Sequence, residues 1–300
     1  MKKTLRRVCK KRWMYLLLLP GMLYYFVFKY VPMWGLLIAF KDYSPWDGFI
    51  GSPWVGLEHF QRFFSSNFQQ LMTNTLWLGF LGIIFYFPAP IILALLLNEI
   101  RREKFKKTIQ TLIYVPHFLS WVIIVGITYI FFNADDGVIS ILIQRMGGMP
   151  VSILTNPDVF RPIVILQQIW KEAGWGTIIF LAALAGVDSS QYEAALIDGA
   201  NRWQQTIFIT LPAIKSTIIT LLILRLGTFL DTGFEQILLM TNGLNREVAE
   251  VFDTFVYQNG VVLGDFSYTA AVGLFKSLVG LILILTANYL AKRSGEEGII

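Results

Sequence analysis

The sequence contains little of what soluble proteins use most. Of its 300 residues, 15% are charged and one, Cys9, is a cysteine, whereas charged residues make up about a quarter of an ordinary soluble domain. A single cysteine excludes a scaffold held by internal disulfides. The shortage of charge, together with a 55% share of hydrophobic residues, excludes a cytosolic enzyme and a nucleic-acid-binding module.

Motifs of nucleotide binding and hydrolysis are missing as well. The sequence has no G-x-x-x-x-G-K-[ST], G-x-S-x-G or H-E-x-x-H pattern, which mark phosphate loops, serine hydrolases and zinc proteases. Its two histidines, His59 and His117, are far apart in sequence, so no metal site is predicted. We therefore expect no catalytic residue, metal or cofactor on this chain.

What the sequence does contain is long apolar runs. A helix needs about 20 mostly apolar residues to cross a bilayer. Six segments reach that length: 13–40, 71–97, 109–132, 162–187, 213–240 and 268–290. Because they do not alternate as barrel strands do, we predict helices, which satisfy their backbone polar groups internally. The predicted fold is an all-α membrane protein with six transmembrane helices in one transmembrane domain, 13–300.

Positive charges predict the orientation of these spans. The segment 1–12 has seven basic residues and no acidic one. We interpret it as a cytoplasmic segment and not as a signal peptide, because no small-residue cleavage site ends the apolar run after it. Six crossings then put 99–107, 188–212 and 291–300 inside, and 41–70, 133–161 and 242–267 outside. The inner segments and their edges hold sixteen Lys and Arg residues against five in the outer loops, in agreement with the positive-inside rule.

The inner loop 188–212 carries the most specific pattern. Its fixed positions are Glu193, Ala194, Ala195, Gly199, Ile209, Leu211 and Pro212. The small alanines let a short helix approach a partner closely, Gly199 can take left-handed backbone angles in a sharp turn, and Pro212 fits the first turn of a helix. At all seven positions the pattern resembles the E-A-A-x₃-G-x₉-I-x-L-P loop of importer-type ABC transporter permeases.

This resemblance implies a fold, a function and partners. In that family the loop forms a coupling helix that docks on an ATPase subunit, where its glutamate pairs with an arginine; carried over, that role belongs to Glu193, and Gly199 shapes the turn. The chain would form half of a pathway with a second permease subunit, in a bacterial plasma membrane, with both termini cytoplasmic. Two ATPase subunits, which would bind ATP and Mg²⁺, and an extracellular solute-binding lipoprotein would complete the importer.

Other stretches resemble permeases for sugars. They are 30–35 (Y-V-P-M-W-G), 39–45 (A-F-K-D-Y-S-P), 55–60 (V-G-L-E-H-F), Asn74-Thr75, 94–98, Val115-Pro116, Asp136-Gly137, Ile169-Trp170 and Gly174. The first two are most similar to the LplB-like group, whose members are associated with complex oligosaccharides. The resemblance therefore implies a carbohydrate substrate, and within that class an oligosaccharide.

Ionisable residues inside predicted spans are candidates for a substrate site. The fifth span contains Arg225, Asp231 and Glu235, next to Gln236. If that span is one helix, Asp231 and Glu235 are four residues apart and share a face. Such a polar strip would line the transport path. Structural ion pairs between helices are an equally good interpretation.

Aromatic side chains would supply the other half of a sugar site, because the apolar faces of sugar rings stack on them. Trp121, Trp170 and Trp175 are the candidates, and Lys171 and Glu172 add charge in the fourth span. The alternative for each tryptophan is an anchor at the membrane interface, where tryptophan is enriched.

Two other classes of function would also use the carboxylates of the fifth span. In a secondary transporter or channel, Asp231 and Glu235 would bind a coupling ion. That class is expected to show paired broken helices in related halves, and the sequence shows none. A membrane enzyme would use one of these carboxylates, but nothing places a second catalytic group beside it. Neither alternative explains the seven-position loop.

Overall fold

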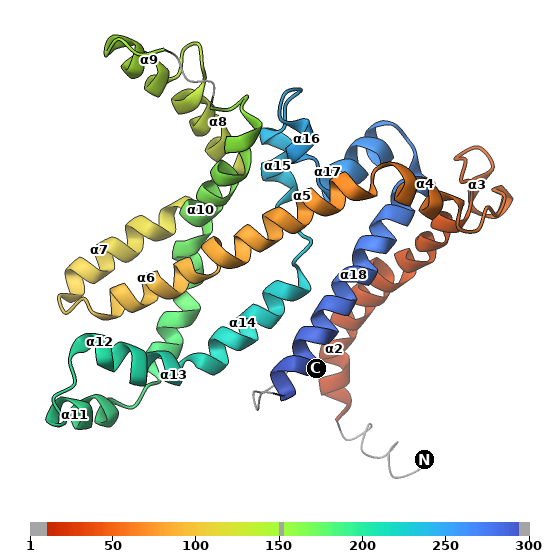
Figure 1. The fold of residues 1–300 in the computed structure, drawn as a ribbon. Coiled ribbons are helices and arrows are strands. Elements are labelled where there is room, and N and C mark those ends of the chain that lie inside the picture. The colour runs from red at the N-terminus through yellow and green to blue at the C-terminus, as the bar shows by residue number, and fades with distance from the viewer. Residues whose placement is uncertain (1–10, 150–152, 294–300) are drawn as a thin grey trace. The chain divides into compact units, whose positions relative to one another are not determined.

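The computed structural model describes residues 11–149 and 153–293 (Figure 1). Within these ranges the regular elements are helices, apart from one antiparallel bridge between Lys41 and Trp54, so the predicted all-α class is confirmed. Residues 1–10 of the predicted basic segment and the C-terminal residues 294–300 lie outside the described residues. The chain forms two compact units, one from 1–65 and 256–274, the other from 66–255 and 275–300.

The first unit begins with a continuous helical run over the first predicted span. α2 (Arg12–Tyr25) passes into a π-helical turn, η1 (Phe26–Tyr30), and then into a 3₁₀ helix, η2 (Val31–Phe40). Pro32 has no backbone N–H to donate, and the wider π turn directly before it accommodates that loss. The chain therefore changes helical pitch at this proline without ending the helix.

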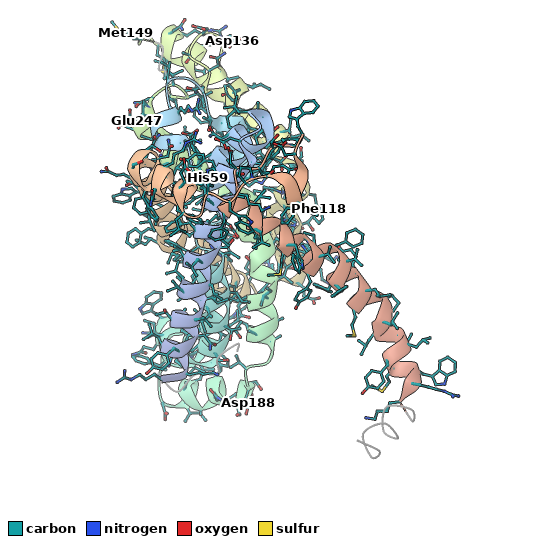
Figure 2. All side chains as sticks on the ribbon, turned by 90° about the vertical axis from the view of Figure 1, so that its right-hand side faces the viewer. His59, Phe118, Asp136, Met149, Asp188 and Glu247 are labelled. Carbon is teal, nitrogen blue, oxygen red and sulfur yellow. The ribbon has the colours of Figure 1, made fainter. Side chains whose placement is uncertain are left out.

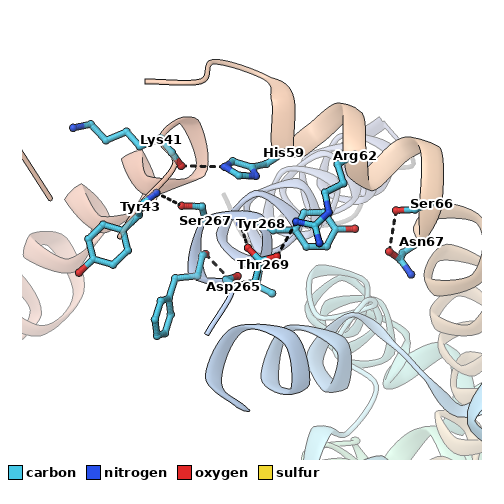
Figure 3. Close-up of polar contacts among 11 residues, drawn as sticks. Lys41, Tyr43, His59, Arg62, Ser66, Asn67, Asp265, Ser267, Tyr268 and Thr269 are labelled. Carbon is cyan, nitrogen blue, oxygen red and sulfur yellow. Dashed lines mark hydrogen bonds and ion pairs between the residues drawn. The ribbon is translucent and has the colours of Figure 1, made fainter. Parts of the chain in front are cut away.

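A buried lysine shapes the loop after η2, which contains α3 (Gly48–Gly51). The Lys41 ammonium donates hydrogen bonds to the carbonyl oxygens of Phe49 and Ser52, at 2.7 and 3.2 Å. In α4 (Glu58–Ser66), the ring Nε2 of His59 lies 3.0 Å from the Lys41 carbonyl oxygen (Figure 3). The stretches 39–45 and 55–60 are thus held against each other.

The same unit contains the N-terminal part of α18 (Phe266–Arg293), beside α4. Arg62 donates to the Asp265 carboxylate at 2.8 Å, and its guanidinium lies 4.0 Å from the centre of the Tyr268 ring (Figure 3). The Tyr43 N–H donates to the Ser267 hydroxyl at 2.8 Å. These contacts join the loop after η2 to the start of the last predicted span.

The second unit contains the second to fifth predicted spans, most of the sixth, and both loops between the third and fifth. Its helices are α5 (Phe68–Leu81), η3 (Gly82–Tyr86), α6 (Pro88–Asn98), α7 (Glu103–Tyr114), η4 (Val115–Phe118), α8 (Trp121–Phe132), α9 (Val138–Arg145), α10 (Pro157–Ala185), α11 (Ser189–Ile197), α12 (Arg202–Gln205), η5 (Thr206–Thr210), α13 (Leu211–Ala213), α14 (Lys215–Gly227), α15 (Phe234–Met240) and α16 (Arg246–Ala249), with the C-terminal part of α18; α17 (Phe252–Val256) and η6 (Tyr257–Val262) lead from this unit to the first. Figure 2 shows Asp136 and Met149 at one end of the unit and Asp188 at the opposite end. The helices α9 and α11, in the two loops, therefore lie at opposite ends of this unit (Figure 1).

Among the described residues, three helical runs are long and apolar enough to cross a bilayer singly: 12–40, 68–98 and 266–293. Three bent helix pairs bring the possible crossings to six: Glu103–Phe118 with Trp121–Phe132 at 99°, Pro157–Ala185 with Ser189–Ile197 at 71°, and Arg202–Ala213 with Lys215–Gly227 at 60°. The apolar runs of the sequence thus correspond to helices, but the third and fifth predicted spans are not single straight ones.

The third predicted span breaks around Leu119 and Ser120, between η4 and α8. Ser120 caps α8 with its hydroxyl. The buried ammonium of Lys171, in α10, donates to the carbonyl oxygens of His117 and Leu119 at 2.7 and 2.9 Å. A helix end leaves carbonyls that no helical N–H reaches, and in a membrane such groups need partners within the protein. Lys171 supplies them here.

The fifth predicted span breaks between α14 and α15. Gly233, directly before α15, has a φ of +89°, a left-handed conformation that glycine adopts without a steric penalty. The expectation that Asp231 and Glu235 share one helix face is therefore wrong. Asp231 lies in the break, and Glu235 lies in the first turn of α15.

The helices of the second unit pack closely where small residues allow it. α10 meets α7 at Gly174, where a Cβ would overlap the carbonyl oxygen of Ile113, and it meets α6 at Gly176, beside Pro90. A buried apolar cluster then joins α5, α8, α10 and α15; it includes Leu78, Val125, Phe160, Val164, Ile237 and Met240. This packing sets the positions of the polar side chains described next.

Candidate functional site

The seven-position pattern forms a short helix that is capped at both ends. The Asp188 carboxylate accepts a hydrogen bond from the Ser190 N–H at 2.9 Å at the start of α11. That backbone bond, with a second from the Ser190 side chain, lowers the pKa of Asp188 below its ordinary value. After the helix, Gly199 has a φ of +79°, and the Ala200 N–H donates to the Ala195 carbonyl at 2.9 Å, which is a common helix ending. The predicted turn at Gly199 is confirmed.

The second half of the pattern leads from this turn to α14. Asn201 and Gln204 cap α12 reciprocally, each side chain accepting from the other's backbone N–H at 2.9 and 2.8 Å. The π turn η5 follows, and Pro212 lies in the first turn of α13, as predicted. The Tyr192 hydroxyl lies 2.9 Å from that of Thr210, so α11 is tied to η5. Ile209 and Leu211 are half-buried.

Glu193 lies on an exposed face of α11 with apolar neighbours. Leu196 and Ile197 follow it by three and four residues, which places them beside it on the helix, and they are 57% and 87% exposed. Ala194 is also exposed, and Ala195 is half-buried. Glu193 forms no ion pair with any residue that the structure describes. Glu193, Leu196 and Ile197 thus form an exposed face that combines a carboxylate with apolar area.

A second polar site lies at the break of the fifth span. The Lys276 ammonium, in α18, lies 2.5 Å from one carboxylate oxygen of Asp231 and 2.5 Å from one of Asp253 in α17. The lysine and Asp253 side chains are 15% and 28% exposed, whereas that of Asp231 is 60% exposed. A cavity of about 350 Å³ adjoins Asp231 and Lys276.

The other charged candidates of the fifth span lie apart from this triad. Glu235 is exposed in the first turn of α15. Arg225 lies in α14 with its guanidinium 5.6 Å from the centre of the Tyr86 ring, close to Gly82 of the same π turn, η3. The structure therefore places Arg225 in α14, Asp231 in the break and Glu235 in α15, and not on one helix. The charges of Arg225 and Asp231 still interact.

Gln236 belongs to a buried chain of amides that links three helices. Its side chain, 1% exposed, donates to the Val164 carbonyl and to the Gln167 side-chain oxygen, both at 2.8 Å. Gln167 in turn donates to the Thr128 hydroxyl at 2.6 Å. In this conformation Gln236 joins α15 to α10 and α8 and is not in contact with open space.

An aromatic and ionic cluster surrounds the break in the third span. The rings of His117 and Trp175 stack with 4.5 Å between centres and 4° between planes. The His117 Nδ1 lies 2.7 Å from the Glu172 carboxylate, which also lies 3.4 Å from the Lys171 ammonium. Trp175 is 46% exposed. The structure thus brings Trp175 together with Lys171 and Glu172.

The other two tryptophan candidates differ in their surroundings. Trp121 begins α8, with the Lys171 ammonium 5.5 Å from its ring centre, so it belongs to the same cluster. Trp170 is 50% exposed. In the part of the chain that the structure covers, no three His, Cys, Asp or Glu side chains are grouped to hold a metal ion.

The family model described as "Binding-protein-dependent transport system inner membrane component" matches residues 86–295, more than two thirds of the chain. The chain belongs to this family. Its resemblance to importer-type ABC transporter permeases is therefore confirmed, and it is a membrane transport component and not an enzyme.

Permeases of known systems are similar over nearly the whole chain. Protein LplB of Bacillus subtilis (strain 168) is 59% identical over 97% of this chain and 92% of its own length. The polygalacturonan/rhamnogalacturonan transport system permease protein YteP of the same organism is 54% identical over 99% and 93%. A chain of the crystal structure of a bacterial alginate ABC transporter, in complex with an alginate pentasaccharide-bound periplasmic protein, is 38% identical and covers 98% of this chain and 99% of its own, with a TM-score of 0.90. The fold is that of an importer-type permease.

Sequence reasoning missed several polar residues of this permease. Lys276 is visible as a lone charge in the apolar run 268–290, and intramembrane charge was a signal that could have found it. Asp253 is in a predicted outer loop, and nothing in the sequence pairs it with Lys276. His117 is an ionisable residue within the predicted span 109–132, and the same signal could have found it.

Proposed function

We propose that this permease forms half of the pathway of an oligosaccharide-importing ABC transporter and couples to an ATPase subunit through α11. The observation that carries the proposal is the exposed face of Glu193, Leu196 and Ile197 on a helix capped at both ends. Such a face offers a carboxylate for a charge-assisted bond to an arginine and apolar area to bury. Because α12, η5 and α13 connect α11 to α14, a displacement of α11 is passed to the membrane helices.

The proposal also includes a topology and a set of partners. The chain crosses the bacterial plasma membrane six times as one permease domain, with both termini and 188–212 in the cytoplasm and with 41–70, 133–161 and 242–267 outside. A second permease subunit completes the pathway. Two ATPase subunits bind ATP and Mg²⁺, and an extracellular lipoprotein delivers the substrate. The charge count of the sequence supports this orientation.

The names of the relatives support a carbohydrate substrate. They include polygalacturonan/rhamnogalacturonan, alginate and, for a permease named AraP that is 28% identical over 96% of this chain, arabinooligosaccharides. These substrates share chains of linked sugar rings with hydroxyl groups. We assign an oligosaccharide to this permease on that ground.

The side chains proposed to line the path are of two kinds. Trp121, Trp170 and Trp175 offer rings to the apolar faces of sugars. Asp231, Glu235 and Arg225 offer polar groups to hydroxyls, and Gln236 would do so in a conformation that opens its buried amide chain. Support comes from the exposure of Trp170, Trp175 and Asp231, because a polar group at membrane depth is expected to face a water-filled path or another protein and not lipid.

The substitution Glu193→Ala tests the coupling proposal. Removing one partner of a hydrogen-bonded charge pair at an interface costs about 2 kcal/mol or more, so the ATPase subunits should co-purify less well, and ATP hydrolysis should lose its dependence on the substrate-loaded binding protein. Both are measured on the purified complex in nanodiscs.

Gln191→Ala is the matched control. Gln191 is exposed on the same helix, and because it is two residues from Glu193 it lies on another side of α11. It should leave ATPase binding and coupled hydrolysis unchanged. Normal co-purification and normal coupling in the Glu193→Ala complex would refute docking through this face.

The orientation is tested by thiol labelling in a Cys9→Ser background. A cysteine at Asp136 should react with a membrane-impermeant maleimide added to intact spheroplasts, and a cysteine at Asp198 should react only after the membrane is permeabilised. Both positions are exposed in the structure, so reactivity reports the side of the membrane. Labelling of the Asp198 position from outside would overturn the topology.

A further inference from the structure

The cavity of about 350 Å³ beside Asp231 has a distinctive wall. It lies between the end of α14 and the middle of α18, and its lining includes Gly227, Leu230, Asp231, Lys276, Gly280 and Leu281. Its volume is at the small end of ligand pockets, which run from about 300 to 1,000 Å³. One wall carries the charges of Asp231 and Lys276, Ser277 adds a polar group, and the rest of the lining is apolar or consists of glycine.

The charges at this wall and directly behind it do not cancel. Lys276 carries one positive charge and lies 2.5 Å from each of two carboxylates, Asp231 and Asp253. The triad therefore has a net charge of −1 if all three groups are ionised. One oxygen of Asp231 contacts the lysine. The other has no hydrogen-bond partner among the residues that the structure describes, and the side chain is 60% exposed.

We propose that this cavity is a subsite for one uncharged sugar residue of the transported oligosaccharide, bound through the free oxygen of Asp231. A carboxylate oxygen accepts hydrogen bonds from hydroxyl groups and is the stronger acceptor because it is ionised. Leu230 and Leu281 provide apolar area for the face of a sugar ring, as is usual in ligand pockets. The proposal rests on the proposed transport function, and it adds a site and a charge preference.

The sign of the triad and the position of the free Asp231 oxygen give this preference. The charge of Arg225 also interacts with Asp231, but Arg225 does not line the cavity. A uronate carries a carboxylate of its own, and two like charges a few ångströms apart repel strongly in a partly desolvated site. A neutral sugar residue brings no such charge. Asp253 does not line the cavity, so its part is indirect: it shares Lys276 with Asp231, which keeps the lysine from neutralising Asp231 alone.

Glycines on both helices leave space for the sugar. Gly227 and Gly280 line the cavity from α14 and α18, and a Cβ on Gly227 would meet the Ile284 side chain. Larger side chains here would fill the space beside Asp231. The charged group is thus open because the two helices carry no side chain at these points.

The experiment measures protection of a cysteine in the cavity wall. In the assembled transporter with Cys9→Ser, Leu281→Cys is labelled with monobromobimane in the presence of α-1,4-galactotriose or α-1,4-trigalacturonate, which differ in the oxidation of C6. Leu285→Cys, one turn further along α18 and 48% exposed but outside the cavity, is the control position. Galactotriose should slow labelling at Leu281→Cys only, with about a ten-fold lower half-protecting concentration than trigalacturonate, which corresponds to ~1.4 kcal/mol.

Two carboxamide variants separate the roles within the triad. Asp231→Asn removes the negative charge, and its remaining amide oxygen is expected to face the Lys276 ammonium. The cavity then loses its charged acceptor, so protection by galactotriose should fall. Asp253→Asn removes the same charge outside the cavity, so galactotriose should still protect and trigalacturonate should now protect as well. The two variants should therefore differ in protection by galactotriose. Loss of a structural ion pair with Lys276 would instead affect both variants alike.

Each other result decides against the subsite. Protection by neither sugar, equal protection of both cysteines, or better protection of Leu281→Cys by trigalacturonate when Asp231 and Asp253 are both intact would overturn it. ATP hydrolysis driven by the binding protein is measured on the same preparation. A complex that hydrolyses ATP normally but shows no protection retains the proposed transport function and loses only the subsite.

Discussion

Two regions of this permease are held together in opposite ways. The segment 188–213 is stabilised mainly by bonds between residues close in sequence, such as Asp188 with Ser190 and Asn201 with Gln204. The membrane helices of the second unit depend on bonds between residues far apart, such as Lys171 with His117. A locally stabilised segment can bind a partner and move as one piece, whereas the helices must assemble before their polar groups are satisfied. Changing each kind of contact separately tests this difference.

The largest effect is expected where two helices touch. In Gly174→Ala the added methyl group would overlap the Ile113 carbonyl oxygen, so α10 and α7 must separate. Overpacking of this kind costs about 3 kcal/mol at the upper end of its usual range. We expect a lower thermal unfolding midpoint and a lower yield of the assembled complex, measured by size-exclusion chromatography after heating.

Gly126→Ala is the control, because Gly126 is also inside a helix, α8, but has nothing within 4 Å of an added Cβ. It should leave the unfolding midpoint almost unchanged. If both substitutions have the same small effect, the close contact between α10 and α7 does not determine assembly.

The same difference explains what the sequence could predict. The apolar runs gave the helices, and the short-range patterns gave the turn at Gly199 and the first turn at Pro212, because each depends on its own neighbours. The sequence does not predict the break before Gly233, because the apolar run continues through it. The pairing of Lys276 with Asp231 and Asp253 could not be predicted, because it requires three segments to meet in space.

A smaller effect is expected at the turn after α11. Gly199 has positive φ and open space around it, so Gly199→Ala introduces backbone strain of roughly 1–2 kcal/mol and no clash. Hydrogen exchange of α11 amides should become faster and coupled ATP hydrolysis weaker, while the unfolding midpoint of the complex stays the same. Gly199→Asn should be milder, because asparagine tolerates this conformation better.

Gly243→Ala serves as the control for this turn. Gly243 is an exposed loop glycine with open space for a Cβ, and its φ is not positive. The substitution should change neither exchange nor coupling. A fall in the unfolding midpoint of Gly199→Ala as large as that of Gly174→Ala would show that the coupling segment is not independent of the membrane helices.

The smallest effect concerns the cap of α11 and its dependence on pH. The pKa of Asp188 is lowered chiefly by the backbone bond from Ser190, so the folded helix releases this proton more readily than the unfolded segment does. Linkage then requires that the cap stabilises α11 fully above the ordinary Asp pKa of 3.8. The cap loses this contribution as the pH falls through the lower pKa of the folded state.

Asp188→Asn keeps a capping side chain and removes the titration. Hydrogen exchange at Ser190, referenced to the intrinsic rate, should therefore lose protection at acid pH in the parent and not in Asp188→Asn. Asp188 is exposed and its charge is screened by solvent, so the loss of protection should stay within the first turn of α11. A loss of protection that spread to α14 would contradict the local character of this segment.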